Sequence, residues 1–280
     1  MSNAVILMSG LLNCNEIPTI KKQLHDFKFE HDDFKVVIHT WDHEYNDSHT
    51  FVNWFKANFP KNKIYIQKEK YDKFDMMVNK FASSEFINYI NSITGSATES
   101  TDVMRRHTAI YYSMAQSYMF AKTVVNITDD TLLFRIKPNT AFFYNKIDLE
   151  NFFEKYIELG YRTAAPNKND TVFISLDLII GDYPSVIVNE NAFCAYAGVW
   201  QKVFGDNTEN FLKHTIQEIY IKHFDQCMMQ YIKNKGERFP FPVGSIVWSD
   251  IFLYHKLCIK PYIMAAAGKQ DRSQKKHIFY

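Results

Sequence analysis

The sequence predicts an α/β fold: a Rossmann-like, mixed and mostly parallel sheet flanked by helices, with a C-terminal helical portion packed on the same core. Short, continuously apolar runs recur along the chain, and such runs are typical of strands buried on both faces of a parallel sheet. Segments with helical periodicity separate them, which indicates right-handed strand–helix–strand units. The length of 280 residues suits one large α/β core.

The first predicted unit comprises a strand at residues 4–8, a helix at 17–27 and a strand at 35–40. Ser9-Gly10 ends the first strand, and Pro18 suits the first turn of the helix because its missing N–H would have no partner there. The unit contains neither the GxGxxG pattern nor a Walker loop.

The middle of the chain continues this alternation. We expect a short strand at residues 63–67, then a polar and mobile segment at 71–100. A broad apolar face predicts a long helix at 105–122, and the next buried strand at 131–136 ends before Pro138, which cannot continue a ladder.

The remaining elements are predicted from weaker patterns. A strand is expected at residues 171–175, and an apolar stretch follows it to Gly181. Helices are expected at the following places: residues 148–159, 189–203, 210–233 and 249–257.

Composition disfavours several classes of function. The formal net charge is +1, so the chain lacks the basic excess that a nucleic-acid partner requires. Cys14, Cys194, Cys227 and Cys258 are scattered, which predicts reduced thiols in a reducing compartment and no zinc site. No run resembles a signal peptide or a membrane span, so we expect a cytoplasmic protein.

The C-terminal tail combines basic and aromatic side chains. These are Lys269, Arg272, Lys275, Lys276, Phe279 and Tyr280. Such a tail is either solvated or makes a peripheral contact with an anionic membrane surface.

Ligands of open α/β sheets bind at the carboxyl ends of the strands, and the first two strand ends carry candidate groups. Gly10, after Ser9, allows a ligand to approach the backbone, although a plain turn needs the same residues. Thr40, Trp41 and Asp42 offer a hydroxyl, an aromatic ring and a carboxylate to a nucleotide. The alternative is that Trp41 anchors the sheet edge to a helix.

Two later segments offer charged groups. Arg135, Lys137 and Asn139 share one face of a strand end, which predicts a diphosphate clamp or merely an exposed strand end. Asp177 lies in an apolar stretch, so it is either a general base or a capping residue. Asp129-Asp130 fits a turn better than a metal pair.

Four motifs, in this order, resemble those of bacterial and viral glycosyltransferases of the WavE or capsular-polysaccharide type. The first is a strand ending in Ser-Gly at residues 5–10, and the second is a strand closing with His-Thr-Trp-Asp at 37–42. Tyr-Tyr-Ser at 111–113 and the strand at 130–139 form the third. The fourth is the Asp…Gly element at 177–181.

The resemblance implies a GT-A fold over residues 1–205 that binds a nucleotide-diphosphate sugar, with a helical portion at 206–280 on the same core. It implies transfer of the sugar to a glycan or lipid-linked acceptor in surface polysaccharide or glycoconjugate synthesis. The family places the nucleotide among five residues: Ser9, Gly10, Thr40, Trp41 and Asp42. The location would be the cytoplasm, at the inner membrane surface, or the host cytoplasm if the protein is viral.

The resemblance also assigns chemical roles. Arg135 would lie near the diphosphate and Asp177 near the acceptor or donor sugar, where it would remove the acceptor proton in an inverting displacement. Asn139 stands where the family has an acid that holds Mn²⁺ or Mg²⁺, and Lys137 replaces an arginine. Metal binding is therefore weak, or Arg135 and Lys137 replace the metal, or activity is lost. The alternative function is an inactive protein that binds sugar nucleotides or glycans.

Overall fold

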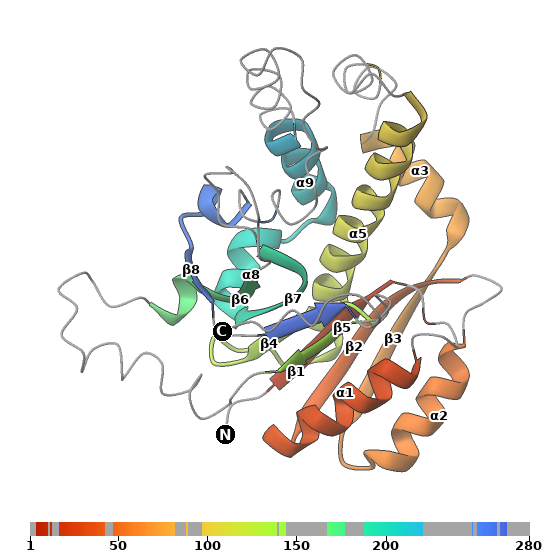
Figure 1. The fold of residues 1–280 in the computed structure, drawn as a ribbon, viewed down its shortest axis with the longest axis vertical. Helices are drawn as coiled ribbons and strands as arrows, with labels where there is room; N and C mark the ends of the chain where they lie inside the picture. Colours follow the sequence, from red (N-terminus) through yellow and green to blue (C-terminus); the bar gives the residue numbers. More distant parts are fainter. Residues whose placement is uncertain are drawn as a thin grey trace, which may run out of the picture.

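The computed structural model describes most of the chain (Figure 1). The described residues are 4–10, 12, 17–42, 47–81, 88, 97–138, 140–143, 167–176, 188–220, 248, 251–261 and 264–267.

A seven-stranded sheet forms the centre of the described part, in the order β3-β2-β1-β4-β7-β6-β8. Its strands are β1 (Ala4–Ser9), β2 (Phe34–Asp42), β3 (Lys63–Lys70), β4 (Leu132–Ile136), β6 (Thr171–Leu176), β7 (Val188–Tyr196) and β8 (Cys258–Pro261). All neighbouring pairs are parallel except those that β7 makes with β4 and β6. The predicted fold class, a Rossmann-like and mostly parallel mixed sheet flanked by helices, is confirmed.

The chain changes direction across the sheet between β1 and β4. From β1 it proceeds outward through β2 to β3, then returns to place β4 on the other side of β1. Such a switch point opens a crevice beyond the carboxyl ends of the two strands, because the connections leave them in opposite directions. By this rule, the switch point is the part of this sheet best placed to receive a ligand.

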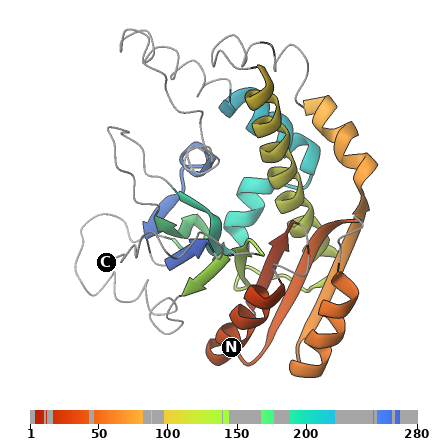
Figure 2. The same cartoon turned by 45° about the vertical axis from the view of Figure 1, so that its right-hand side comes forward.

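One face of the sheet is covered by α1 (Ile17–Glu30) and α2 (Ser48–Asn58) (Figure 2). The even-numbered side chains of β1 and β2 point to this face, as the two-residue period of a strand requires. They pack with Phe51 and Phe55, which lie one helical turn apart on α2.

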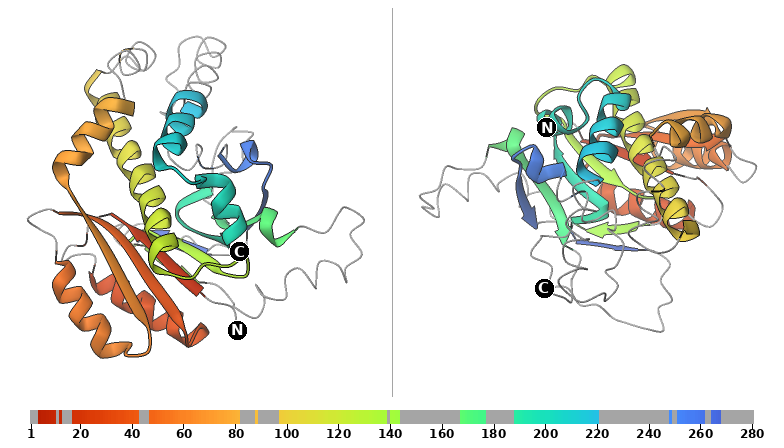
Figure 3. Two further views of the ribbon diagram at one scale, coloured as in Figure 1. Left: turned by 180° about the vertical axis from the view of Figure 1, so that it is seen from behind. Right: turned by 90° about the horizontal axis from the view of Figure 1, so that it is seen from above.

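The opposite face is covered by α5 (Ala97–Val124) and α8 (Ala197–Phe204). Val5 and Leu7 of β1 point toward these helices. Helix α3 (Tyr71–Phe81) lies along one side of α5, and α9 (Thr208–Lys213) lies along its other side (Figure 3). A π-helical segment, His214–Tyr220, continues α9.

Three differences from the predicted elements have physical reasons. Residues 188–196 form strand β7 rather than the first half of a helix, because Phe193 and Ala195 bury one face while Cys194 buries the other. Part of the segment expected to be polar and mobile is helix α3, whose Met77 and Phe81 pack on the core. Helix α2 was not predicted, although Phe51 and Phe55 give it an apolar face.

The C-terminal portion contributes strands as well as helix. β8 extends the main sheet beside β6, and β9 (Met264–Ala267) pairs with β5 (Thr140–Phe143) in a separate two-stranded sheet. Residues 251–254 are helical, as expected within 249–257. The predicted helix at 148–159 and most of the one at 210–233 lie outside the described residues. The division at residue 205 stays a prediction.

Candidate functional site

The carboxyl ends of β1, β2 and β4 meet at the switch point. The backbone N–H of Gly10 donates a 3.2 Å hydrogen bond to the carbonyl of His39, which joins the ends of β1 and β2. Gly10 has φ +132°, a conformation that L side chains rarely adopt, and a Cβ there would lie 3.8 Å from the ring of Pro138 after β4. Gly10 therefore brings the backbone of β1 close to the segment that follows β4.

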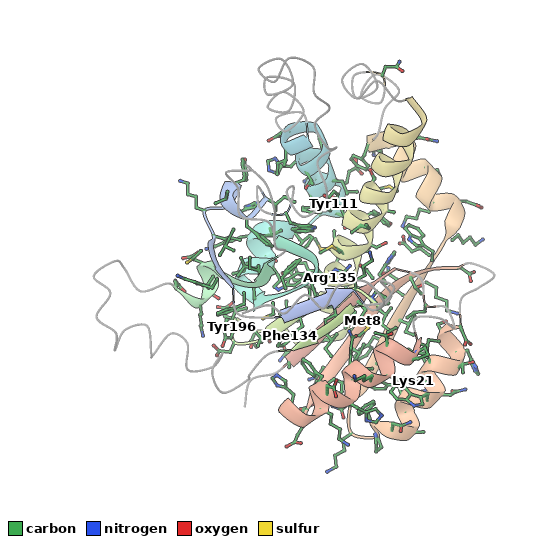
Figure 4. The ribbon with its side chains drawn as sticks, in the orientation of Figure 1. Met8, Lys21, Tyr111, Phe134, Arg135 and Tyr196 are labelled. Atoms are coloured by element: carbon green, nitrogen blue, oxygen red, sulfur yellow. The ribbon has the colours of Figure 1, made fainter. Side chains whose placement is uncertain are left out.

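Ser9, His39 and Arg135 lie on the same face of these three strands. Ser9 pairs with His39 in the register of β1 and β2, and Arg135 pairs with Leu7 in the register of β1 and β4. Figure 4 shows Arg135 on the side of the sheet toward Tyr111 of α5, whereas Phe134 lies on the opposite side. Three polar side chains thus line the α5 face of the switch point.

These polar groups are deeply buried. Ser9 is 4% exposed, His39 0% and Arg135 2%. Among the described residues, the hydroxyl of Ser9 and the Nδ1 atom of His39 have no hydrogen-bond partner. Because a buried polar atom without a partner costs roughly 1–3 kcal/mol, these atoms favour a polar ligand or an ordered water at the switch point.

The three predicted residues at the end of β2 divide between the two faces. Trp41 is 5% exposed, and its ring stacks on Tyr112 of α5 with centroids 5.5 Å apart and planes at 21°. This contact packs the end of β2 against α5, and a role of Trp41 in nucleotide binding stays a prediction. Thr40 is completely buried on the other face, and Asp42 is exposed at the strand end.

A carboxylate from the edge strand completes this side of the site. Glu69 of β3 accepts a 2.6 Å hydrogen bond from the hydroxyl of Tyr112 and a 2.7 Å bond from Lys73 of α3. Its Oε2 atom also lies 3.3 Å from Nε2 of His39. The imidazole of His39 is enclosed edge-on by the rings of Trp41 and Tyr112, with centroids at 5.2 and 5.7 Å. We call His39, Trp41, Glu69, Lys73 and Tyr112 the Glu69 cluster.

The electrostatics of the cluster keep Glu69 ionised. Burial by itself would raise the pKa of Glu69, but the contacts with His39, Lys73 and Tyr112 outweigh it and lower the pKa from 4.5 to about 2. Burial, and then the hydrogen bond to this carboxylate, raise the pKa of Tyr112 well above its usual range. The cluster therefore holds an ionised carboxylate, paired with the ammonium of Lys73, at neutral pH.

Sequence reasoning did not identify Glu69, although the period of β3 could have indicated it. Tyr65, Gln67 and Glu69 share one face of the strand by alternation, and this is the face that α5 covers. Nothing in the sequence pairs position 69 with 39 and 112, because those contacts depend on how α5 docks.

The predicted diphosphate clamp lies only partly within the described residues. Lys137 follows directly after β4, two residues beyond Arg135, and is half-buried. Asn139 and Asp177, the predicted metal and general-base positions, lie outside the described residues. Within the described ranges, no three side chains of His, Cys, Asp or Glu are grouped so that they could hold a metal ion.

Two of the four cysteines lie within the described residues. Cys194 is buried and Cys258 is partly buried, and both are free thiols. Burial raises the pKa of the Cys194 thiol well above its usual range, which favours the protonated thiol. None of the described helices is long and apolar enough to cross a membrane. The basic-aromatic tail lies outside the described residues.

No family model matches the sequence, and no curated protein matches it. The WavE-type resemblance therefore stays a prediction from the motifs.

Solved structures with a similar arrangement include three glycosyltransferases. The mannosyltransferase Ktr4p from S. cerevisiae in complex with GDP is 12% identical, over 89% of this chain and 66% of that chain, with a TM-score of 0.44. The apo form of mouse xyloside xylosyltransferase 1 is 10% identical, over 92% and 84%, with a TM-score of 0.40. The galactosyltransferase LgtC, in complex with donor and acceptor sugar analogues, is 9% identical, over 92% and 73%, with a TM-score of 0.37. Likenesses at these TM-scores and identities do not show a shared family or activity.

Proposed function

We propose that this chain is a glycosyltransferase that moves a sugar from a nucleotide-diphosphate sugar to a glycan or lipid-linked acceptor in surface polysaccharide or glycoconjugate synthesis. We place the donor at the switch point between β1 and β4. The nucleotide would lie along Ser9, Gly10 and the end of β2, and the diphosphate beside Arg135 and Lys137.

One observation carries the proposal. Ser9, His39 and Arg135 come from three adjacent parallel strands and present a hydroxyl, an imidazole and a guanidinium on one face of the switch point. A hydroxyl and a cation are suited to phosphate oxygens, because the cation balances their charge and both can donate hydrogen bonds. Gly10, whose φ of +132° favours glycine, has no side chain that would keep a ligand from the end of β1.

The reaction proposed is a single displacement at the anomeric carbon. The acceptor oxygen forms the new bond to that carbon, and the bond from the carbon to the diphosphate oxygen breaks. The acceptor proton passes to the carboxylate of Asp177, and the electron pair leaves with the nucleoside diphosphate. Arg135 and Lys137 would stabilise the charge that develops on the leaving group. The anomeric configuration would be inverted.

The clamp of Arg135 and Lys137 is proposed to carry more of the leaving-group charge than a metal does. Asn139 offers only a neutral carbonyl oxygen, whereas Mn²⁺ and Mg²⁺ prefer carboxylate oxygen. The substitution Asn139→Asp should therefore increase the dependence of nucleotide binding on Mn²⁺. An unchanged metal response in that variant would remove position 139 from the proposed site.

The experiment is a thermal-shift series with UDP, GDP, CMP, TDP and their sugars, with and without Mn²⁺, followed by measurement of the nucleotide released from each donor. Stabilisation by one nucleotide together with release that depends on Asp177, tested with Asp177→Asn, supports the transferase. The absence of any shift would contradict the nucleotide-sugar site.

Asn139 also motivates the second candidate, an inactive sugar-nucleotide or glycan-binding protein. That candidate predicts a thermal shift without sugar release in the original chain. Release by the original chain would exclude it, whereas release by Asn139→Asp alone would support it.

A further inference from the structure

A second concave surface lies outside the switch point, between α3, α5 and the start of α9. It encloses about 550 Å³, within the range of roughly 300–1,000 Å³ that is usual for small-molecule sites. A stripe on α5 forms its floor: Tyr112, Gln116, Met119 and Thr123. Lys73 and Met77 of α3 line one wall, and residues 206–209 line the other. Figure 3 shows α3 and α9 on the two sides of α5. We call this surface the α5 groove.

The charges of the α5 groove are balanced in pairs. Lys73 is 2.7 Å from Glu69, and Lys122 is 2.7 Å from Asp206. A third pair joins the two walls, because Lys80 of α3 lies 2.5 Å from Glu209 of α9. With each lysine beside a carboxylate, the groove has no excess of one sign with which to attract a charged ligand.

Neutral polar side chains line the groove beside these ion pairs. The amide nitrogen of Gln116 contacts the hydroxyl of Thr208 at 3.3 Å, and the side chain of Gln116 also hydrogen-bonds with Tyr112. The side-chain oxygen of Asn207 caps α9 by accepting from the N–H groups of Glu209 and Asn210, so its NH₂ group takes no part in the cap. The groove therefore offers both acceptors and donors without a net charge.

We propose that the α5 groove binds a neutral oligosaccharide. Sugar hydroxyls both donate and accept hydrogen bonds, which matches the mixture at Gln116, Thr208 and Asn207. Met77 and Met119 supply flexible apolar surface, which can adapt to the C–H faces of sugar rings. A phosphorylated ligand would find the lysines of the groove already paired with carboxylates.

The groove is separated from the switch point by a stack of two rings. Tyr112 lies in the groove floor, and its ring stacks on Trp41 at the end of β2. A glycan in the groove is therefore next to the Glu69 cluster without occupying the proposed nucleotide site. Its binding does not depend on the proposed transferase activity.

The test is saturation-transfer NMR on the full chain with maltohexaose, cellohexaose, mannohexaose, xylohexaose and chitohexaose. Thr123→Trp places a large ring at one end of the groove. Thr50→Trp is the matched control, because Thr50 is also an exposed helical position but lies on α2, across the sheet. Gln116→Leu keeps the side-chain volume and removes its hydrogen-bonding atoms.

We expect at least one oligosaccharide to bind to the original chain and to Thr50→Trp. Its affinity should fall at least about fivefold in Thr123→Trp and in Gln116→Leu, and UDP or GDP should leave it unchanged. The proposal is overturned if none of the five sugars gives a signal at millimolar concentration, or if both groove variants bind as the original chain does. Displacement of the sugar by a nucleotide would also overturn it, because the sugar would then occupy the switch point. If only nucleotide binding fails, the proposed transferase function is contradicted and the proposed oligosaccharide site in the groove is not.

Discussion

The hydroxyl of Tyr112 donates a 2.6 Å hydrogen bond to the carboxylate of Glu69, which ties helix α5 to the edge strand β3. The same phenol ring stacks on Trp41 of β2. One tyrosine thus holds the helix against two neighbouring strands, directly beside the carboxyl ends where we place the donor.

Replacing Tyr112→Phe should lower the free energy of unfolding by about 1.5–3 kcal/mol, because the lost bond has an ionised acceptor whose carboxylate stays partly buried. Tyr118→Phe is the matched control on the same helix, since the hydroxyl of Tyr118 donates to the neutral amide of Gln201 at 3.0 Å. Its cost should be about 0.5–1.5 kcal/mol. If urea denaturation gives the same loss of unfolding free energy for both variants, the charge of Glu69 adds nothing to its hydrogen bond with Tyr112.

Acid should weaken the fold through Glu69. Its pKa is lowered from 4.5 to about 2, so its contribution to stability is complete above about pH 4.5 and is lost as the pH falls toward 2. Glu69→Gln should therefore destabilise the protein at pH 7 by on the order of 2 kcal/mol, and the difference from the original chain should shrink at low pH. Asp206→Asn is the control: the pKa of Asp206 is also lowered, chiefly by its bond to Lys122, but its side chain is 82% exposed and water screens the pair. A pH-independent effect of Glu69→Gln would contradict the assignment.

Gly10→Ala should cost about 1–3 kcal/mol of stability, because φ +132° is strained for any L side chain although the contact with Pro138 is ordinary. Gly205→Ala is the control, with φ +62° and no heavy atom within 4 Å of the added Cβ. Both variants should lower the melting temperature, and only Gly10→Ala should weaken nucleotide binding. If both variants bind the nucleotide as tightly as the original chain, the nucleotide site lies elsewhere.

Lys137→Ala should raise the Kd for the nucleoside diphosphate at least about tenfold, since a hydrogen bond to a charged group is worth roughly 1.5–3 kcal/mol. The melting temperature should change little, because Lys137 is only partly buried. Lys63→Ala removes an exposed lysine at the start of β3, the opposite end of the sheet, and should leave the Kd unchanged. Calorimetric titration measures the Kd of each variant. If Lys137→Ala and the original chain bind the nucleoside diphosphate with equal affinity, Lys137 is not part of the clamp.

The strands that flank the switch point could be predicted because burial on both faces leaves a continuous apolar run. Ala4–Ser9 and Leu132–Ile136 are buried at every position, and both were expected within one or two residues. Val188–Tyr196 was misassigned because its apolar and polar residues fit a helix as well as a strand. Only its pairing with β4 and β6 decides between the two.

The parts of the candidate site that lie at strand ends could be predicted from the sequence. The parts that depend on how helix α5 packs on the sheet could not. Gly10 and Arg135 follow from the rule that ligands meet the carboxyl ends of parallel strands. The environment of Trp41 does not follow from this rule, because the sequence alone allows its ring to face either a ligand or a helix. The contacts of Glu69 could not be predicted either, since its partners come from β2, α3 and α5.

The approach of Gly10 to Pro138 also bears on the order in which the molecule assembles. The two residues are more than a hundred positions apart, so the crevice does not exist until β4 has docked beside β1. Closing so long a loop is slow compared with forming the local unit of β1, α1 and β2. A nucleotide bound at the switch point would therefore slow unfolding much more than it would speed folding. In stopped-flow experiments, the donor should lower the unfolding rate constant and leave the folding rate constant nearly unchanged.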